Sequence, residues 1–325
     1  MRHSTGLFSR SFAFIGLSLI VSGGCHRIDS TTIAFIPQTT GIDIWESAHE
    51  AAKSEGDKYG LTIYWNAPPR EDDAKQQVAL VDTVLQRPLK GLILAPDHYL
   101  ALLSALRSAG ERHLPVAVID TRLPLDPNPD LSFFVNDEQE MGQEIAERLA
   151  FTLKDHGEVA IVGMAANTDY LYRRLLALRE ALSTKHPSIH IIAIKNGTGN
   201  ITEDQQIVVA LLRNHPHIDA LIALDGASLR AAWSERRIGN LSNQVQLIGC
   251  DRERDVMRGI RLGEINSTVV EDTGEMAREA VRFIAQSGKS NRQGMIREIK
   301  PLLITQANID SPSIQAFLSM DRSNP

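Results

Sequence analysis

Short runs rich in β-branched residues alternate with amphipathic helical stretches along most of this chain, and the alternation occurs twice. Such alternation is typical of βαβ units, which build largely parallel sheets flanked by helices. Strands are expected at residues 32–37, 61–65, 91–95, 116–119 and 133–135, and again at residues 158–162, 190–194, 220–224, 245–249 and 267–270. Two right-handed βαβ halves fit poorly into one sheet of this size, so we predict two Rossmann-like α/β lobes. A single eightfold barrel is the alternative.

The first 25 residues differ from the rest of the chain. Arg2 and Arg10 precede a short apolar run that ends in small residues before Cys25, which is the plan of a secretory signal peptide. The apolar run has roughly ten residues, whereas a membrane-spanning helix needs about 20, so cleavage after export is preferred to a permanent anchor. Cys25 resembles the lipid-modified cysteine of bacterial lipoproteins, although Ser22 departs from that pattern. Lipidation of Cys25 and ordinary cleavage nearby both stay open.

Composition and charge narrow the class of protein. Hydrophobic residues make up 43% and charged residues 23% of the chain, values close to those of soluble globular proteins. The formal charge of −6 becomes −8 without residues 1–24, which contain Arg2 and Arg10 and no acid. An acidic protein is a poor candidate for binding nucleic acid. We therefore expect an exported protein outside the cytoplasm, either free or lipid-anchored, that has no nucleic-acid partner.

Acidic residues follow several of the expected strands. Open parallel sheets bind ligands beyond the carboxyl ends of their strands, where loops and helix N-termini converge. The acids in such positions are Asp97, Asp120, Asp225, Asp251 and Glu271. Any one of them could instead cap the next helix by accepting a backbone N–H. As a group they provide charged acceptors for the hydroxyl groups of a sugar or polyol.

Two other residues complete the predicted site. So many acids need a cation among them, and Arg174 in the helix that starts near Tyr170 is our choice; an ordinary solvated arginine is the alternative. Trp45 opens the first helix, where its indole could stack on a sugar ring, or it could simply pack in the core.

Enzyme signatures are absent from the sequence. It has no His-Glu-x-x-His, Cys-x-x-Cys or Gly-x-Ser-x-Gly motif. His215 and His217 flank a proline and are expected in a surface turn rather than a metal site. The strand-end acids could include a glycosidase pair, but no two of them stand apart from the rest. We predict a protein that is not an enzyme and needs no metal or cofactor.

These features resemble the type I periplasmic sugar-binding proteins, of the ribose and galactose kind, which deliver ligand to an ABC importer. The segments that carry the resemblance are residues 32–37, 45–53, 91–97, 115–120, 136–137 and 247–251. The resemblance implies ligand contacts from Trp45, Asp120, Arg174, Asp225, Asp251 and Glu271, with Asp43, Arg122 and Tyr170 as secondary candidates. The chain departs from the family pattern at Ile44, where a second aromatic is usual, and at Thr121, Leu224 and Glu271, where arginine, asparagine and glutamine are usual.

The resemblance also implies a domain plan and partners. The first lobe is expected to comprise residues 31–135 and 272–297, the second lobe residues 136–271 and 298–310, and residues 311–325 a tail. Three crossings between the lobes would form a hinge, and ligand contacts from both lobes would favour closure. The expected partner of a monomeric chain is an ABC permease. A receptor that presents the sugar to a sensor kinase or chemoreceptor is the alternative.

Overall fold

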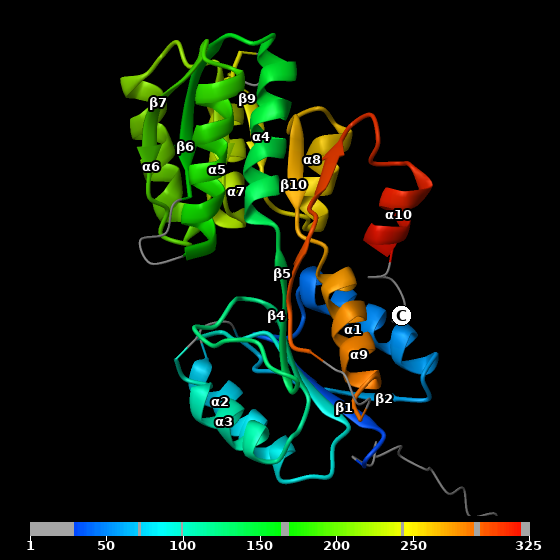
Figure 1. Ribbon diagram of the computed structural model, residues 1–325. Helices are drawn as coiled ribbons and strands as arrows, with labels where there is room; N and C mark the ends of the chain where they lie inside the picture. Colours follow the sequence, from blue (N-terminus) through cyan, green and yellow to red (C-terminus); the bar gives the residue numbers. More distant parts are fainter. Residues whose placement is uncertain are drawn as a thin grey trace, which may run out of the picture.

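The computed structural model describes residues 29–70, 73–98, 100–163, 169–241, 244–288 and 293–319, which form two six-stranded sheets (Figure 1). The first sheet has the order β11-β5-β4-β3-β1-β2, and all its neighbouring strands run parallel. Helices α1 and α9 cover one face of this sheet, and α2 and α3 cover the other. The bounds are β1 (Thr32–Ile36), β2 (Thr62–Trp65), β3 (Gly91–Leu94), β4 (Val116–Asp120), β5 (Leu131–Asn136), β11 (Ile296–Ile299), α1 (Asp43–Asp57), α2 (Ala74–Leu85), α3 (Leu103–Glu111) and α9 (Thr273–Ala285).

The second sheet repeats this plan with the order β12-β10-β9-β8-β6-β7, and only the β10–β12 pair is antiparallel among these strands. Helices α4 and α5 cover one face, while α6, α7, α8 and α10 pack on the other. The bounds are β6 (Gly157–Val162), β7 (Ile189–Lys195), β8 (Ala220–Ala223), β9 (Gln246–Gly249), β10 (Ser267–Val270), β12 (Leu302–Thr305), α4 (Glu138–Leu153), α5 (Asp169–Lys185), α6 (Ile201–Asn214), α7 (Gly226–Ile238), α8 (Arg254–Arg261) and α10 (Pro312–Ser319).

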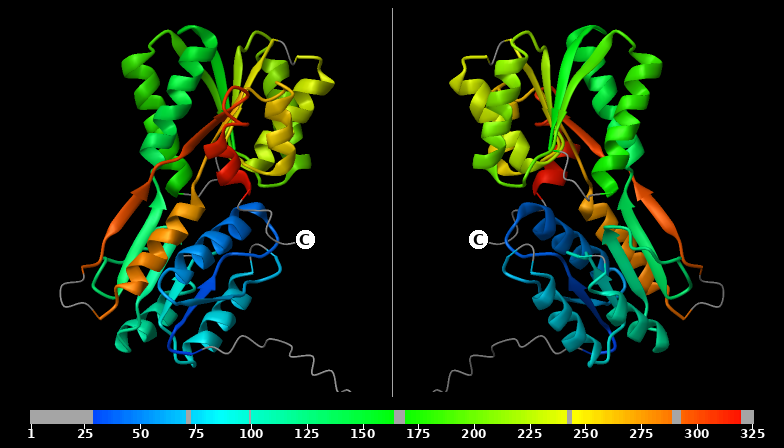
Figure 2. Two further views of the ribbon diagram at one scale, coloured as in Figure 1. Left: turned by 90° about the vertical axis from the view of Figure 1, so that its right-hand side faces the viewer. Right: turned by 90° about the vertical axis from the view of Figure 1, so that its left-hand side faces the viewer.

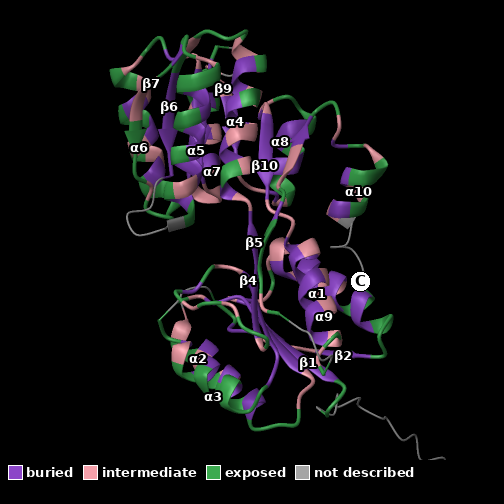
Figure 3. Cartoon of the chain, in the orientation of Figure 1, coloured by how far each residue is buried: buried purple, intermediate pink, exposed green. Residues whose placement is uncertain are grey.

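Most central strands are buried on both faces, as Figure 3 shows for both lobes. Helices on both sides of a parallel sheet require apolar side chains pointing in both directions, which explains the near-continuous apolar runs in the sequence. The predicted two-lobed α/β architecture is confirmed. The single barrel is excluded because the strands form two separate sheets.

The chain passes between the lobes after β5, after β10 and after β11. Helix α9 follows a strand of the second sheet but packs against α1 and β4 of the first lobe. There the hydroxyl of Thr273 donates a hydrogen bond to the carbonyl of Ile44 over 2.9 Å. Strand β11 pairs with β5 as far as Ile299, so the first lobe extends beyond residue 297. The three connecting segments lie close together where the lobes meet (Figure 2).

Aspartates begin four of the helices. Asp73, Asp137, Asp225 and Asp272 each accept a hydrogen bond from the backbone N–H three residues further on. An N-cap acceptor satisfies a helical donor that has no partner within the helix, and its negative charge favours the helix N-terminus. These caps fix where the helices start behind the strand ends, and so they fix the shape of the loops between them.

The expected tail contains a helix. Within α10, Ile314 and Phe317 are buried in the core cluster of the second lobe, and the guanidinium of Arg252 lies 4.3 Å from the centroid of the Phe317 ring. The apolar residues of this helix are therefore part of a folded lobe.

The expected signal segment and Cys25 lie outside the described residues. Among the helices that the structure describes, none combines the length and apolar composition needed to cross a membrane.

Candidate ligand-binding site

A cleft between the two lobes is lined by loops that follow the carboxyl ends of strands from both sheets. On the first lobe these loops follow β1, β3 and β4; on the second they follow β7, β8, β9 and β10, and the start of α5 adds further lining residues. All the predicted ligand-binding residues except Asp43 line this cleft: Trp45, Asp120, Arg122, Tyr170, Arg174, Asp225, Asp251 and Glu271. The strand topology therefore brings residues that are up to 226 positions apart in sequence into one place.

Asp120 and Glu271 form a carboxyl pair at the junction of the lobes. Asp120 ends β4 with φ of 68°, a left-handed conformation that residues other than glycine rarely adopt and that is found preferentially at functional sites. Its Oδ2 accepts hydrogen bonds from the Gln38 amide over 3.2 Å and from the Thr121 hydroxyl over 3.1 Å. The Asp120 carboxyl also lies against that of Glu271, which follows β10, and each carboxyl influences the pKa of the other. This contact links the two lobes.

Arg174 lies beneath the carboxyl pair and is 2% exposed. Its Nε donates to Glu138 over 2.7 Å, and its Nη2 donates to Glu138 over 3.1 Å and to Glu271 over 3.0 Å. Its Nη1 donates to the carbonyl of Leu224 over 3.0 Å, and the guanidinium also contacts the thiol of Cys250. The solvated alternative is excluded. Because every nitrogen already has a protein acceptor, Arg174 is better suited to positioning Glu138 and Glu271 than to holding a ligand.

A second ion-pair group surrounds Asp251. Its Oδ1 accepts the backbone N–H of Arg252 over 2.6 Å and that of Glu253 over 3.1 Å. Its Oδ2 accepts a short hydrogen bond from Arg230, which also binds the carboxylate of Asp255 over 2.7 and 2.8 Å. These bonds hold the Asp251 carboxylate in place at the cleft wall.

Asp225 is a helix cap as well as a wall residue. It accepts the backbone N–H of Ser228 over 2.8 Å and the hydroxyl of Ser228 over 3.2 Å. The same hydroxyl donates to the buried carboxylate of Asp204 over 2.7 Å. The capping interpretation therefore holds for Asp225. Burial raises the pKa of its carboxyl, and the hydrogen bonds from Ser228 oppose that effect.

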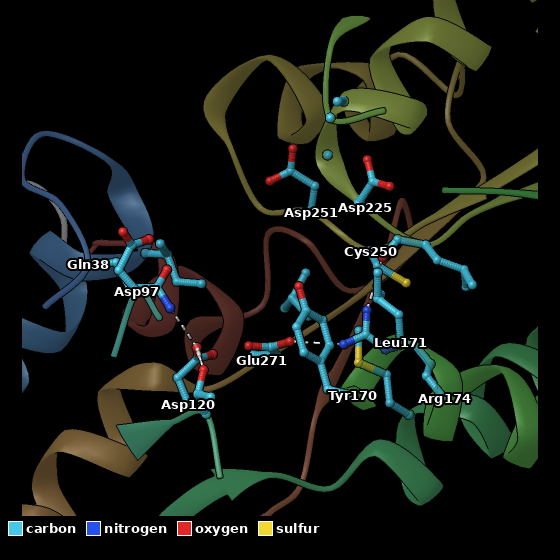
Figure 4. A pocket seen from close by; sticks show the side chains of 18 of the residues that line it. Gln38, Asp97, Asp120, Tyr170, Leu171, Arg174, Asp225, Cys250, Asp251 and Glu271 are labelled. Atoms are coloured by element: carbon cyan, nitrogen blue, oxygen red, sulfur yellow. Dashed lines mark hydrogen bonds and ion pairs between the residues drawn. The ribbon is translucent and has the colours of Figure 1, made fainter. Parts of the chain in front are cut away.

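The aromatic residues are placed differently from our expectation. Trp45 reaches the cleft wall, but it is 2% exposed and packs in the core cluster of α1, α9 and the first sheet. Its burial leaves little ring surface for stacking on a sugar, so the core-packing alternative applies. Tyr170 instead stands in the cleft, 40% exposed, with the Arg174 guanidinium 5.6 Å from its ring centroid (Figure 4).

Two of the secondary candidates lie at the edge of the cleft. Asp43 is outside the lining, and its carboxylate lies 3.4 Å from Nε of Arg254 at the start of α8. Arg122 is exposed at the rim. Asp43 therefore connects the lobes beside the site rather than within it.

Four site residues had no place in the sequence prediction: Gln38, Glu138, Arg230 and Cys250. Gln38 follows the first strand, and Cys250 follows β9 directly, so their positions beyond strand ends were a usable signal. Arg230 lies one helical turn after Gly226, on the helix that Asp225 caps, which places it near the next strand end. Glu138 likewise lies two residues after β5, but its role of binding a buried arginine carries no local signal.

Both carboxyls of the pair have pKa values above their ordinary ones. Burial raises the pKa of Glu271 to about 7, with a further increase from the charge of Asp120, while Arg174 opposes the change. Burial likewise raises the pKa of Asp120, and the charge of Glu138 acts in the same direction. Two adjacent carboxyls resist losing both protons, so the pair holds a proton near neutral pH when no other cation is present.

Glu271 gives a pH-dependent stability with a definite sign. Its pKa is above its ordinary value of 4.5 when the chain is folded. The folded state therefore binds more protons between about pH 4.5 and 7, so stability is expected to fall as the pH rises through this range. The loss is at most about 3 kcal/mol. Urea unfolding of the ligand-free protein at several pH values between about 5 and 8 measures it.

Glu271→Gln is expected to flatten this pH dependence, because the amide does not titrate. Glu298→Gln provides the matched control, since Glu298 is exposed on β11. Asp120, Glu138, Arg174, Tyr170 and Cys250 surround Glu271 in both proteins. Equal pH slopes for the wild type and Glu271→Gln would contradict the assignment.

Within the described residues, no group of three or more His, Cys, Asp or Glu side chains is arranged to hold a metal ion. Residues 33–290 match the sequence model of a protein family described as "Periplasmic binding protein domain". The match covers well over half of the chain. The chain belongs to the periplasmic binding protein family. It is a binding protein rather than an enzyme, as are the relatives below, and the resemblance drawn from the sequence is confirmed.

Several sugar-binding proteins are similar to this periplasmic binding protein. The D-ribose/D-allose-binding protein of Pseudomonas aeruginosa is 22% identical over 262 residues, which cover 77% of this chain and 80% of the relative. The D-apiose import binding protein of Paraburkholderia graminis is 25% identical over 241 residues, covering 73% and 76%. A solved sugar-binding protein of a sugar ABC transporter from Bacillus halodurans superimposes with a TM-score of 0.79 and 18% identity, covering 86% of this chain and 99% of that structure.

Proposed function

We propose that this periplasmic binding protein captures a monosaccharide or polyol in the cleft between its lobes and delivers it to an ABC importer. The observation that carries the proposal is the convergence of Asp120, Glu271 and Asp251, borne on loops of different strands, around one cleft between the lobes. Each carboxylate is held by donors from the protein and offers oxygens to ligand hydroxyls, which form stronger hydrogen bonds with charged acceptors than with neutral ones. The sugar-binding relatives support the same ligand class.

The proposal includes closure of the lobes around the ligand. A ligand shifts a conformational equilibrium only if it binds one state better, and contacts to both lobes exist together only in the closed state. The ion pair between Asp43 and Arg254 already joins the lobes beside the cleft. Export to the outside of the cytoplasmic membrane, free or lipid-anchored through Cys25, belongs to the same proposal.

A thermal-shift screen tests ligand capture. We expect at least one member of a panel of pentoses, hexoses, inositols and nucleosides to raise the melting temperature by several degrees, because ligand that binds only the folded state stabilises it. Small-angle scattering with that compound should show a smaller radius of gyration. A panel with no stabilising member, or stabilisation without compaction, would count against the proposal.

Uptake of the identified compound, labelled with a radioisotope, tests delivery. Cells that lack this chain are expected to take up the compound much more slowly at concentrations near its dissociation constant, and the wild-type gene should restore uptake. Unchanged uptake together with loss of a ligand-induced transcriptional or chemotactic response would favour the sensory alternative.

A further inference from the structure

The junction of the lobes has more negative than positive charge. Asp120 and Glu271 contact each other, Glu138 lies behind them, and Arg174 is the guanidinium whose charge acts on all three carboxyls. Arg174 makes its two-pronged contact with Glu138 and a single contact with Glu271. From the residues that the structure describes, Asp120 receives the neutral donors of Gln38 and Thr121. One cation is therefore shared among three acids.

The other arginines of the cleft are engaged elsewhere or lie further out. Arg230 is bonded to Asp251 and Asp255, and the Arg252 guanidinium lies over the Phe317 ring. Arg122 is exposed at the rim, and Arg173, one position before Arg174 on α5, is half-buried in the lining of the cleft. The charge of the carboxyl pair is thus left to be balanced by a proton or by a cation that enters the cleft.

The surroundings of the pair suit an organic cation with hydroxyl groups. The ring of Tyr170, 40% exposed, stands beside Glu271 in the cleft (Figure 4) and can attract an ammonium group or cover the apolar face of a ring. Asp97 and Asp251 line the same cleft and can accept hydrogen bonds from hydroxyls further out. A neutral sugar would leave the pair holding its proton, whereas an ammonium would replace that proton and bond both carboxylates.

We infer that the ligand carries a protonated amino group among its hydroxyls, as in an amino sugar or aminocyclitol, and that this ammonium binds between Asp120 and Glu271. The inference rests on the proposed function and specifies its ligand class. When the ammonium enters, the proton shared by the two carboxyls leaves to the buffer, and both carboxylates become ionised around the new cation. Binding is therefore coupled to proton release.

Isothermal titration calorimetry with matched pairs tests this inference. The pairs are glucose with glucosamine, galactose with galactosamine, mannose with mannosamine, and scyllo-inositol with scyllo-inosamine, at about pH 6.5. At least one amine is expected to bind about 30-fold or more tightly than its hydroxyl partner, as charge-assisted hydrogen bonds allow. N-acetylated amines, which keep the nitrogen but lose the charge, should lose this advantage. Heats measured in phosphate and in MES, a buffer without a polyhydroxyl amine, should differ for the amine, because the buffer takes up the released proton.

Two variants and a control locate the ammonium. Asp120→Asn and Glu271→Gln are each expected to weaken amine binding by about 10-fold or more and to remove the difference between buffers. Asp126→Asn removes a carboxylate from the exposed rim of the same cleft and should change the affinity by less than about threefold. An equal effect of all three variants would show that only the overall charge of the cleft matters, which contradicts the assigned contact. Melting curves verify that each variant is folded.

The outcomes separate the inference from the function on which it rests. A neutral sugar that binds more tightly than its amine, with equal heats in both buffers, would overturn the inference and leave the proposed function intact. If neither the neutral compounds nor the amines bound, that result would count against the inference and against the proposed function.

Discussion

Arg174→Met is expected to destabilise the protein by about 3–5 kcal/mol, because it leaves the buried Glu138 carboxylate without its cation. Glu138 and Arg174 are 5% and 2% exposed, so water cannot replace the lost contacts. The same change releases Glu271, which loses its 3.0 Å bond to Arg174, and removes the donor to the carbonyl of Leu224. Urea unfolding measures the effect, and ligand binding should be lost in the fraction that still folds.

Three further variants make this prediction specific. Arg179→Met removes an exposed arginine from the same helix and should change stability by less than about 0.5 kcal/mol. Arg174→Lys keeps the charge but cannot form the forked contact with Glu138, so it should remain clearly less stable than the wild type. Combining Arg174→Met with Glu138→Leu removes both buried charges and should recover part of the loss. A loss below about 1 kcal/mol for Arg174→Met would refute this role.

Much of the fold was predictable because each strand–helix unit carries its pattern locally. In α4, Met141, Ile145 and Leu149 recur every four residues along the sequence, and all three are buried. The strand expected at residues 91–95 is β3, buried along its whole length. By contrast, β11 reads Ile-Arg-Glu-Ile and is mostly exposed at the edge of its sheet, so it has no core pattern to detect. The helix α10 is short, and its burial depends on a lobe that the rest of the chain builds.

The site was predictable only where position along a strand decides the outcome. Asp251 and Glu271 lie together because parallel strands end at the same edge of a sheet, and Asp120 lies at the corresponding edge of the other sheet, across the cleft. Partners are a different matter. Packing between elements far apart in sequence decides whether Trp45 faces the cleft or the core. It also decides which acid binds Arg174. The departures at Thr121 and Glu271 show their consequence only when both side chains are seen around the carboxyl of Asp120.

The two ion-pair groups of the cleft suggest a division of roles. Around Arg174 the charges are buried at the junction of the lobes, so changes there alter stability and binding together. Around Arg230 the group lies on one lobe, and its two acids differ in exposure: Asp251 is 13% exposed in the cleft wall and Asp255 is 47% exposed outside the lining. Because only one of the two acids lines the cleft, substituting each in turn can distinguish contact with the ligand from support of Arg230.

Asp251→Ala is expected to lower ligand affinity by about 100-fold or more while the protein stays folded. The substitution removes a carboxylate that Arg230 and two backbone N–H groups hold toward the cleft. Arg230 keeps its contacts to Asp255 at 2.7 and 2.8 Å, so no charge is left unpaired by the change. Asp251→Asn keeps an oxygen for the backbone donors but loses the charge, and its affinity should fall between those of wild type and alanine variant. Calorimetric titration with the compound found in the thermal-shift screen measures all three.

Asp255→Ala is the matched control, because it removes the other acid bound to the same guanidinium. Asp255 lies outside the cleft lining, so its loss should change affinity by less than about threefold. If both variants lost binding equally, the role of Asp251 would be to support Arg230, and the ligand contact would have to be assigned to Arg230 instead. If Asp251→Ala bound the ligand normally, the acids at the ends of the second lobe's strands would be structural caps. Only loss confined to Asp251 fits a carboxylate that touches the ligand.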